Sequence, residues 1–167
     1  MILIINTTDE TQKVEELTRG LEENNKEYEV VEAGQMKIGH CIGCNHCWLK
    51  NPGECTVKDD HEKILRKMVH ADQIWFISDT TLNFVSPKTK NIVDRMIPLA
   101  TMLLTFKNGQ MRHVMRYKKG YDVGFLIRGE ADMEFLSRWS ERVAVNTDGH
   151  SRGVFSIEQV KEAVACM

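Results

Sequence analysis

Short apolar segments alternate with segments of helical period along most of the sequence. Two of the apolar segments, Ile2 to Ile5 and Gln73 to Ser78, are apolar almost throughout, which is typical of strands buried on both faces of a parallel sheet. Further strands are expected at Tyr28 to Val31, at Tyr121 to Ile127, and at either Val154-Phe155 or Val143 to Val145. Strands that alternate with helices in this way predict an α/β fold with a doubly wound parallel sheet.

Helix signals stand between the expected strands. They are Thr7-x-x-Glu10, which resembles a capping box, then Asp59 or Asp60, Ser86-Pro87, the segment from Ala131 to Val143, and Ser156-Ile157-Glu158. With a strand order of 2-1-3-4-5, a ligand site is expected beyond the carboxyl ends of strands one and three. Loops 6–11 and 79–86 would face each other there, with the loop after Ile127 alongside.

Length and composition narrow the class of protein. The chain has 167 residues, of which 42% are hydrophobic and 28% charged, which fits one domain over residues 1–167 and excludes a disordered chain. A net charge of −2 does not favour a nucleic-acid partner. The apolar start lacks the features of a signal peptide, and Met96 to Phe106 is too short to cross a bilayer. We therefore expect a cytoplasmic protein without a membrane partner.

Four of the five cysteines lie in one short segment, at positions 41, 44, 47 and 55. The spacing is C-x2-C-x2-C-x7-C. In a cytosolic setting, clustered thiols indicate metal or redox chemistry more than a disulfide framework. Three interpretations stay open: Cys41, Cys44, Cys47 and Cys55 ligate a [4Fe–4S] cluster, they bind zinc, or they are reduced thiols without a ligand.

Two longer motifs together resemble a known family. The first runs from Cys41-Ile-Gly-Cys44-Asn-His-Cys47 through Pro52-Gly-Glu-Cys55 to Lys58-Asp-Asp60, and the second includes Ala71-Asp-Gln-Ile74 and Val85-Ser-Pro-Lys-Thr-Lys-Asn-Ile-Val-Asp-Arg95. They are similar to the flavodoxin-like NAD(P)H-dependent FMN reductases, especially the branch that includes iron–sulfur flavoproteins. The motifs cover residues 41 to 95, and the fold pattern extends over the whole chain.

The resemblance implies both a fold and an activity. The fold would be a three-layer flavodoxin-like sandwich with a five-stranded parallel sheet in the order 2-1-3-4-5. The activity would be FMN-dependent oxidoreduction, in which electrons pass from NAD(P)H, or from a [4Fe–4S] cluster, to a small-molecule or protein acceptor. Members of the family are often homodimers or homotetramers, so a homo-oligomer is implied here.

Residues are carried over from the family position by position, and all of them lie in the three loops at the carboxyl edge. The residues expected to bind FMN are Asn6, Thr7, Thr8 and Thr11 after the first strand, Thr80, Thr81, Leu82, Asn83 and Phe84 after the third, and Arg128 and Gly129 after the fourth. No side chain is assigned as a catalytic acid or base.

Two departures from the family motif set up an alternative. The first loop has no glycine and carries Asp9 and Glu10 at the start of a helix, where a phosphate would be repelled by carboxylates. Asp79 follows the third strand, where the family has a small residue, a proline and an aromatic residue. We therefore expect weak FMN binding, and the alternative is a flavodoxin-like protein that has lost flavin and acts as a binding or scaffold subunit.

A basic segment and a few single residues complete the expectations. The segment contains Arg95, Lys107, Arg112, Arg116, Lys118 and Lys119 and has no acidic residue. It could bind the phosphate of NADPH, or be a solvated loop or an oligomer contact. Asp94 and Arg95 are expected to pair at a helix end, and Trp75 to lie in the core. Trp48 is expected to pack the cysteine loop against the protein, or else to cover a flavin or a partner subunit.

Overall fold

A parallel sheet forms the centre of the protein, which is described by a computed structural model that covers residues 1–117 and 119–167. Its strands are β1 (Ile2–Asn6), β2 (Tyr28–Glu32), β3 (Gln73–Thr81), β7 (Asp122–Arg128) and β8 (Ser151–Ser156), in the spatial order β2-β1-β3-β7-β8. This confirms the predicted order 2-1-3-4-5. Of the two candidates for the last strand, the one around Val154 is confirmed, and Val143 to Val145 belongs to a helix.

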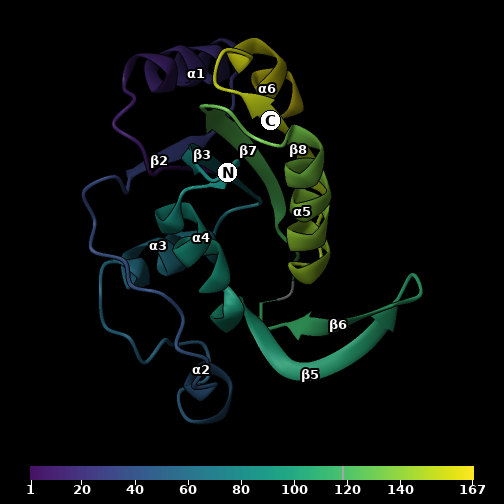
Figure 1. The fold of residues 1–167 in the computed structure, drawn as a ribbon. Coiled ribbons are helices and arrows are strands. Elements are labelled where there is room, and N and C mark those ends of the chain that lie inside the picture. The colour runs from purple at the N-terminus through teal and green to yellow at the C-terminus, as the bar shows by residue number, and fades with distance from the viewer. Residues whose placement is uncertain (118) are drawn as a thin grey trace.

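Helices cover both faces of the sheet (Figure 1). They are α1 (Gln12–Glu23) and α6 (Val160–Cys166) on one face, and α3 (His61–Met68), α4 (Pro87–Asp94) and α5 (Met133–Asn146) on the other. Alternate residues of β1 enter the two resulting cores. Ile2 and Ile4 pack with Leu17 of α1, and Leu3 and Ile5 pack on the face of α3 to α5. The predicted three-layer sandwich is therefore confirmed, and so is Trp75 as a core residue, with 0% exposure.

Helix starts agree with the sequence signals in part. Ser86 caps α4 as predicted, because its Oγ accepts a hydrogen bond from the Thr89 N–H at 3.3 Å. The prediction of a capping box at Thr7 is wrong, because α1 begins at Gln12 and the hydroxyl of Thr7 donates instead to the carbonyl of Ile77. The last helix begins at Val160, after a turn, and not at Ser156.

Several elements were not predicted. They are the short helix α2 (His46–Leu49), strand β4 (Phe84–Val85), which pairs antiparallel with β3, the 3₁₀ turn η1 (Ile97–Leu99), and the hairpin of β5 (Ala100–Lys107) and β6 (Gln110–Met115). The hairpin forms a sheet of its own and stands away from the main sheet (Figure 1). Within the described part of the chain, no helix combines the length and apolarity needed to cross a bilayer.

Candidate functional site at the carboxyl edge of the sheet

Three loops meet where β1, β3 and β7 end. These strands are neighbours in the sheet, and Asp79 in β3 lies in register with Arg128 at the end of β7. The backbone N–H of Thr7 donates to Ile77 O, so the first loop starts directly beside β3. The third loop is held to the second by the Asp132 N–H, which donates to Asn83 O at 3.1 Å. The convergence expected from the topology is therefore present.

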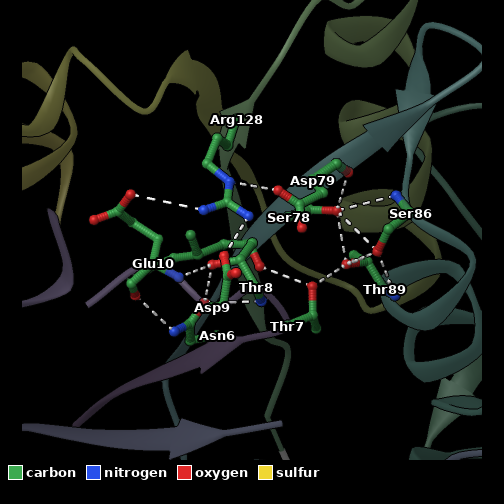
Figure 2. A network of polar contacts seen from close by, with 11 residues as sticks. Asn6, Thr7, Thr8, Asp9, Glu10, Ser78, Asp79, Ser86, Thr89 and Arg128 are labelled. Carbon is green, nitrogen blue, oxygen red and sulfur yellow. Dashed lines mark hydrogen bonds and ion pairs between the residues drawn. The ribbon is translucent and has the colours of Figure 1, made fainter. Parts of the chain in front are cut away.

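Arg128 joins the three loops through carboxylates (Figure 2). Its Nε lies 2.5 Å from Asp79 Oδ1, and its Nη2 lies 2.6 Å from Asp9 Oδ1. Its Nη1 is 3.7 Å from Glu10 Oε2. The hydrogen bond to Asp79, followed by that to Asp9, raises the pKa of Arg128, and Arg128 in turn lowers the pKa of the exposed Asp9 carboxyl. One cation thus serves three anions, and the group keeps a net negative charge.

The start of α1 already holds a carboxylate of the chain itself. Glu10 Oε1 accepts a hydrogen bond from the Lys13 N–H at 3.1 Å. Free N–H groups at the first turn of a helix are the usual site for a phosphate, because they carry partial positive charge. The carboxylate of Glu10 therefore takes up part of the position that a bound phosphate would need.

The polar side chains of the first loop satisfy one another (Figure 2). The Asn6 side-chain oxygen accepts from the Thr8 N–H at 3.0 Å and from the Thr8 hydroxyl at 2.7 Å, and Thr8 Oγ1 accepts from the Glu10 N–H at 3.0 Å. The Asn6 amide donates to Glu32 at 2.7 Å. The loop is thus closed by internal hydrogen bonds that a ligand would have to replace.

Thr7 belongs to a second, buried group of hydroxyls. Its Oγ1 lies 2.7 Å from Thr89 Oγ1, and the Thr89 hydroxyl donates to Ser78 Oγ at 2.8 Å. Ser86 Oγ is 3.2 Å from Thr89 Oγ1. This group ties β3 to the start of α4. Sequence reasoning missed Ser78 and Thr89, and only the Ser86-Pro87 helix start pointed to their position.

The residues after β3 form a tight turn. Leu82 and Asn83 have positive φ angles of 52° and 59°, and the Leu82 side chain is 95% exposed. Thr80 and Thr81 pair with the two residues of β4. The ring of Phe84 packs against Phe135 and Trp139 of α5, with a centroid distance of 4.9 Å to Trp139. The one aromatic ring of the turn is therefore used in packing against α5.

Gly129 allows the third loop to come close to the second. Its φ is +115°, and a Cβ at this position would lie 2.4 Å from Thr80 Oγ1. The expected close approach of backbone is present, and its neighbour in the described residues is Thr80.

The arrangement at this edge does not fit an FMN phosphate as it stands. Three N–H groups of the loop, those of Thr7, Thr8 and Glu10, already donate to acceptors within the protein. The carboxylates of Asp9 and Glu10 face the same edge. A dianion would enter only after Glu10 leaves the start of α1 and Arg128 exchanges at least one carboxylate for the phosphate.

The four clustered cysteines lie in the segment that precedes α3. All are free and partly exposed. Burial raises the pKa of the Cys47 thiol, with smaller contributions from Cys55, Cys41 and Cys44. In the described residues, however, no three His, Cys, Asp or Glu side chains are placed to share a metal ion. The donor set suits a cluster or zinc chemically, but its present geometry does not form a preassembled site.

Arg95 is fully buried and ties the cysteine segment to α4. Its Nη1 pairs with Asp59 at 2.6 Å, and its Nη2 lies 3.4 Å from Cys55 Sγ. The expected Asp94–Arg95 pair was wrong, because Asp94 pairs with Lys90 one turn earlier on the exposed side of α4. Trp48 packs the cysteine loop down, as expected: its Nε1 donates to Ile97 O at 3.0 Å, and its ring lies 4.5 Å from that of His113.

The side chains of the basic segment are distributed over separate partners. Arg112 is buried and pairs with Asp148, and Arg116 donates to the carbonyls of Pro98 and Ala100. Lys119 pairs with Asp72. Lys118 lies outside the described residues. These cations hold structural elements together and do not form a common phosphate site.

Sequence comparison finds relatives among iron–sulfur flavoproteins. One from Methanocaldococcus jannaschii is 36% identical over 89 residues, which cover 53% of this chain and 45% of that protein. One from Archaeoglobus fulgidus is 33% identical over 78 residues, covering 47% of this chain and 34% of the relative. The matched segments therefore span less than half the length of these relatives. No family model matches the sequence.

Structure comparison covers nearly the whole chain. An NAD(P)H:quinone oxidoreductase from Methanothermobacter marburgensis superposes with a TM-score of 0.60 at 14% identity, over 99% of this chain and 94% of that one. A flavone reductase superposes with a TM-score of 0.63 at 18% identity, over 99% of this chain and 59% of that one. Similarity at these identities shows the fold. The chain therefore has the flavodoxin-like fold of these reductases and, over about half its length, is similar in sequence to iron–sulfur flavoproteins, as the motifs indicated.

Proposed function

We propose that the chain is an FMN-dependent oxidoreductase of the NAD(P)H-dependent FMN reductase type, which passes electrons to a small-molecule or protein acceptor. The observation that carries the proposal is the convergence of three loops at the switch point between β1 and β3, with the β7 loop beside them. This is the position at which doubly wound sheets bind ligands. The curated relatives named iron–sulfur flavoproteins and the reductases of the same fold support the proposal.

The flavin site in this proposal opens from a closed resting arrangement. Bound flavin supplies the redox chemistry, and the chain supplies anchoring and orientation. The first-loop residues Asn6, Thr7, Thr8 and Thr11 would lie nearest the phosphate, while the turn from Thr80 to Phe84, with Arg128 and Gly129, would border the ring. Weak binding follows, because part of the binding energy is used to displace Glu10 and to break the loop's own hydrogen bonds.

Two further parts of the proposal concern electron flow and assembly. NAD(P)H is the proposed donor, and Cys41, Cys44, Cys47 and Cys55 are the proposed ligands of a [4Fe–4S] cluster that forms when the loop closes around it. The spacing of the four cysteines and the relatives named iron–sulfur flavoproteins support this assignment. A homo-oligomer is part of the same proposal.

A second function is favoured by one observation, the bridge from Arg128 to Asp9, Glu10 and Asp79. The chain's own carboxylates occupy the cation and the helix start that would hold the phosphate. A flavodoxin-like subunit without flavin, which serves as a binding or scaffold partner, would need no other arrangement.

Titration of the purified protein with FMN separates the two functions. Removing charge by Asp9→Asn and Glu10→Gln is expected to tighten FMN binding by about tenfold or more, because each like-charge contact with the phosphate is lost. The matched control is Glu23→Gln with Glu27→Gln, which removes two exposed charges at and beyond the far end of α1 and should leave the affinity unchanged. Weak binding by the parent, made stronger only in the first variant, supports the oxidoreductase. Absence of binding in the parent and in both variants supports the flavin-free subunit.

A further inference from the structure

The β5–β6 hairpin exposes an unusual amount of apolar surface. Six of its large apolar side chains are more than one third exposed, with Phe106 the highest at 75%. The others are Met102, Leu103, Leu104, Met111 and Val114. Soluble monomers rarely expose a contiguous apolar patch of this kind, and where they do it usually marks an interface. The apolar side chains lie on both faces of the ribbon, since Leu103 and Leu104 are adjacent in an extended strand.

The hairpin is also incomplete as a sheet. In the part of the chain that the structure describes, β5 and β6 pair only with each other, so each presents an unpaired edge. A lone two-stranded hairpin is marginally stable in water, and unpaired apolar edges favour association with another chain. The exposed apolar surface of this hairpin therefore favours contact with another protein surface.

The hairpin is nevertheless held firmly, by two cations near its tip and by a third at its base. Arg112 is 8% exposed, and its Nη1 pairs with Asp148 at 3.0 Å at the end of α5. Lys107 joins the same carboxylate at 2.7 Å. Arg116 donates to Pro98 O and Ala100 O, which fixes β6 to the start of β5. The apolar surface is thus presented by a positioned arm and not by a loosely attached loop.

A groove beside the arm offers a matching surface. It has a volume of about 540 Å³ and lies between η1, the hairpin, α2 and the second half of α5. Its apolar lining includes Trp48, Met96, Met111 and Trp139. Phe106 is not part of this lining, so the most exposed ring of the arm and the groove are separate features of one surface. A surface that carries both a projecting ring and an apolar groove can pair with its own copy about a two-fold axis.

We propose that the hairpin and this groove form the interface between two copies of the chain, with Phe106 of each copy seated in the groove of the other. The available area agrees with this occupant. If each of the six side chains leaves on the order of 100 Å² uncovered, the arm offers about 600 Å² per copy, against about 800 Å² per partner in a standard stable interface. Leu104 and Met111 belong to both the arm and the groove, so the remainder is supplied by the other groove residues, such as Trp48, Met96 and Trp139. The hairpin and the groove would form this interface of the homo-oligomer whether or not the chain binds flavin.

Sedimentation over a wide range of concentration tests the interface. The parent is expected to be a dimer, and Phe106→Lys is expected to raise the dimer dissociation constant about 30-fold or more, as for a central aromatic anchor. Leu82→Lys, measured like the parent without flavin, is the matched control, because Leu82 is apolar, 95% exposed and outside the hairpin, on the β3–β4 turn. A milder variant, Phe106→Ser, and far-UV circular dichroism check that the fold is kept.

Amide hydrogen exchange identifies the surface directly. In the dimer, amides of residues 102–106 and 111–114 should exchange more slowly as protein concentration rises, and those of the β3–β4 turn should not change. A parent that is monomeric at all concentrations overturns the proposal and leaves the hairpin as a surface for a different chain. A dimer that survives Phe106→Lys, or whose hairpin amides exchange rapidly, also overturns it.

Discussion

The carboxyl edge of the sheet and the β5–β6 hairpin are opposite in character. At the carboxyl edge nearly every polar group has a partner: Arg128 bridges three carboxylates, and Asn6 and Thr8 satisfy each other. At the hairpin the side chains are apolar and uncovered, and the strand edges are open. The carboxyl edge, where the topology predicts a ligand site, is closed by its own residues. The hairpin, which no sequence motif indicated as a binding surface, is exposed to solvent. The position of a site in a fold therefore does not determine whether its residues are free to bind a ligand.

The largest expected effect is near the tip of the hairpin, where Arg112 meets Asp148 just beyond α5. Arg112→Ala should lower the free energy of unfolding by about 3 kcal/mol, because it leaves the Asp148 carboxylate with Lys107 alone and removes a buried cation. Urea unfolding measures the loss. Lys107→Ala, which removes an exposed partner of the same carboxylate, should cost less than about 1 kcal/mol.

The Arg112→Ala and Lys107→Ala variants also test the role of the basic segment. If Arg112 served a nucleotide phosphate and not the hairpin, Arg112→Ala would change cofactor preference and leave the unfolding free energy near that of the parent. Equal losses in the Arg112 and Lys107 variants would mean that burial of Arg112 contributes little, and the hairpin would then be less firmly held than its contacts indicate.

Acid should lower the free energy of unfolding before it weakens dimerisation through the apolar hairpin. His61 is fully buried beside Arg95, and burial lowers its pKa to about 4 from an ordinary value of 6.5. The unfolded chain takes up this proton near pH 6.5 and the folded chain only near pH 4, so stability is present above pH 6.5 and falls as the pH drops between these values. The expected loss is roughly 3 kcal/mol.

Thermal unfolding as a function of pH measures this loss, and His61→Gln should remove most of the dependence between pH 6.5 and 4. Below that range the Asp9 carboxyl, whose pKa Arg128 lowers, becomes protonated and the bridge at the carboxyl edge weakens. Dimerisation through the hairpin should be less sensitive to the same change, because the side chains proposed to meet there are apolar. A dimer that dissociates with the midpoint of His61 protonation would contradict this separation.

The smallest effect on stability is expected in the cysteine segment, which borders the hairpin and the end of α4. Its Trp48 reaches the groove beside the hairpin, and its Cys55 lies against Arg95. Cys44 is partly exposed, so Cys44→Ala should change the unfolding free energy little, but it should abolish iron and sulfide uptake in anaerobic reconstitution if the four thiols hold a cluster. Cys166→Ala, outside the segment, is the control. Equal iron in both variants, or none in the parent, would remove the cluster from the proposed function.

Much of the fold was predictable because its signals are local. Ile2 to Ile5 and Ile74 to Ile77 are buried on both faces, and their uniform apolarity predicts this directly. Ser86-Pro87 marks the start of α4 because capping and the fixed φ of proline act within one turn. The hairpin also had a local signal, Asn108-Gly109, whose residues adopt positive φ angles of 53° and 71°. It was missed because β5 has consecutive apolar residues and β6 has the adjacent polar residues Arg112 and His113, so neither strand shows the regular alternation that identifies a half-buried strand.

By itself, the sequence determined the alternation of strands and helices and the gathering of four cysteines, since each depends on periodicity or close spacing along the chain. The strand order, and with it the meeting of three loops at one edge, was predicted from the resemblance to a known family. Only the tertiary structure decided which charges pair. Arg128 meets Asp9 and Asp79, and Arg95 meets Asp59 and not Asp94, although these partners are far apart in sequence. The physical reason is that an ion pair depends on distance and burial in space, and long side chains from neighbouring elements can each reach several candidates. The closed carboxyl edge follows from these ion pairs, and the uncovered hairpin follows from its position outside the main sheet. Neither can be predicted from a local sequence pattern.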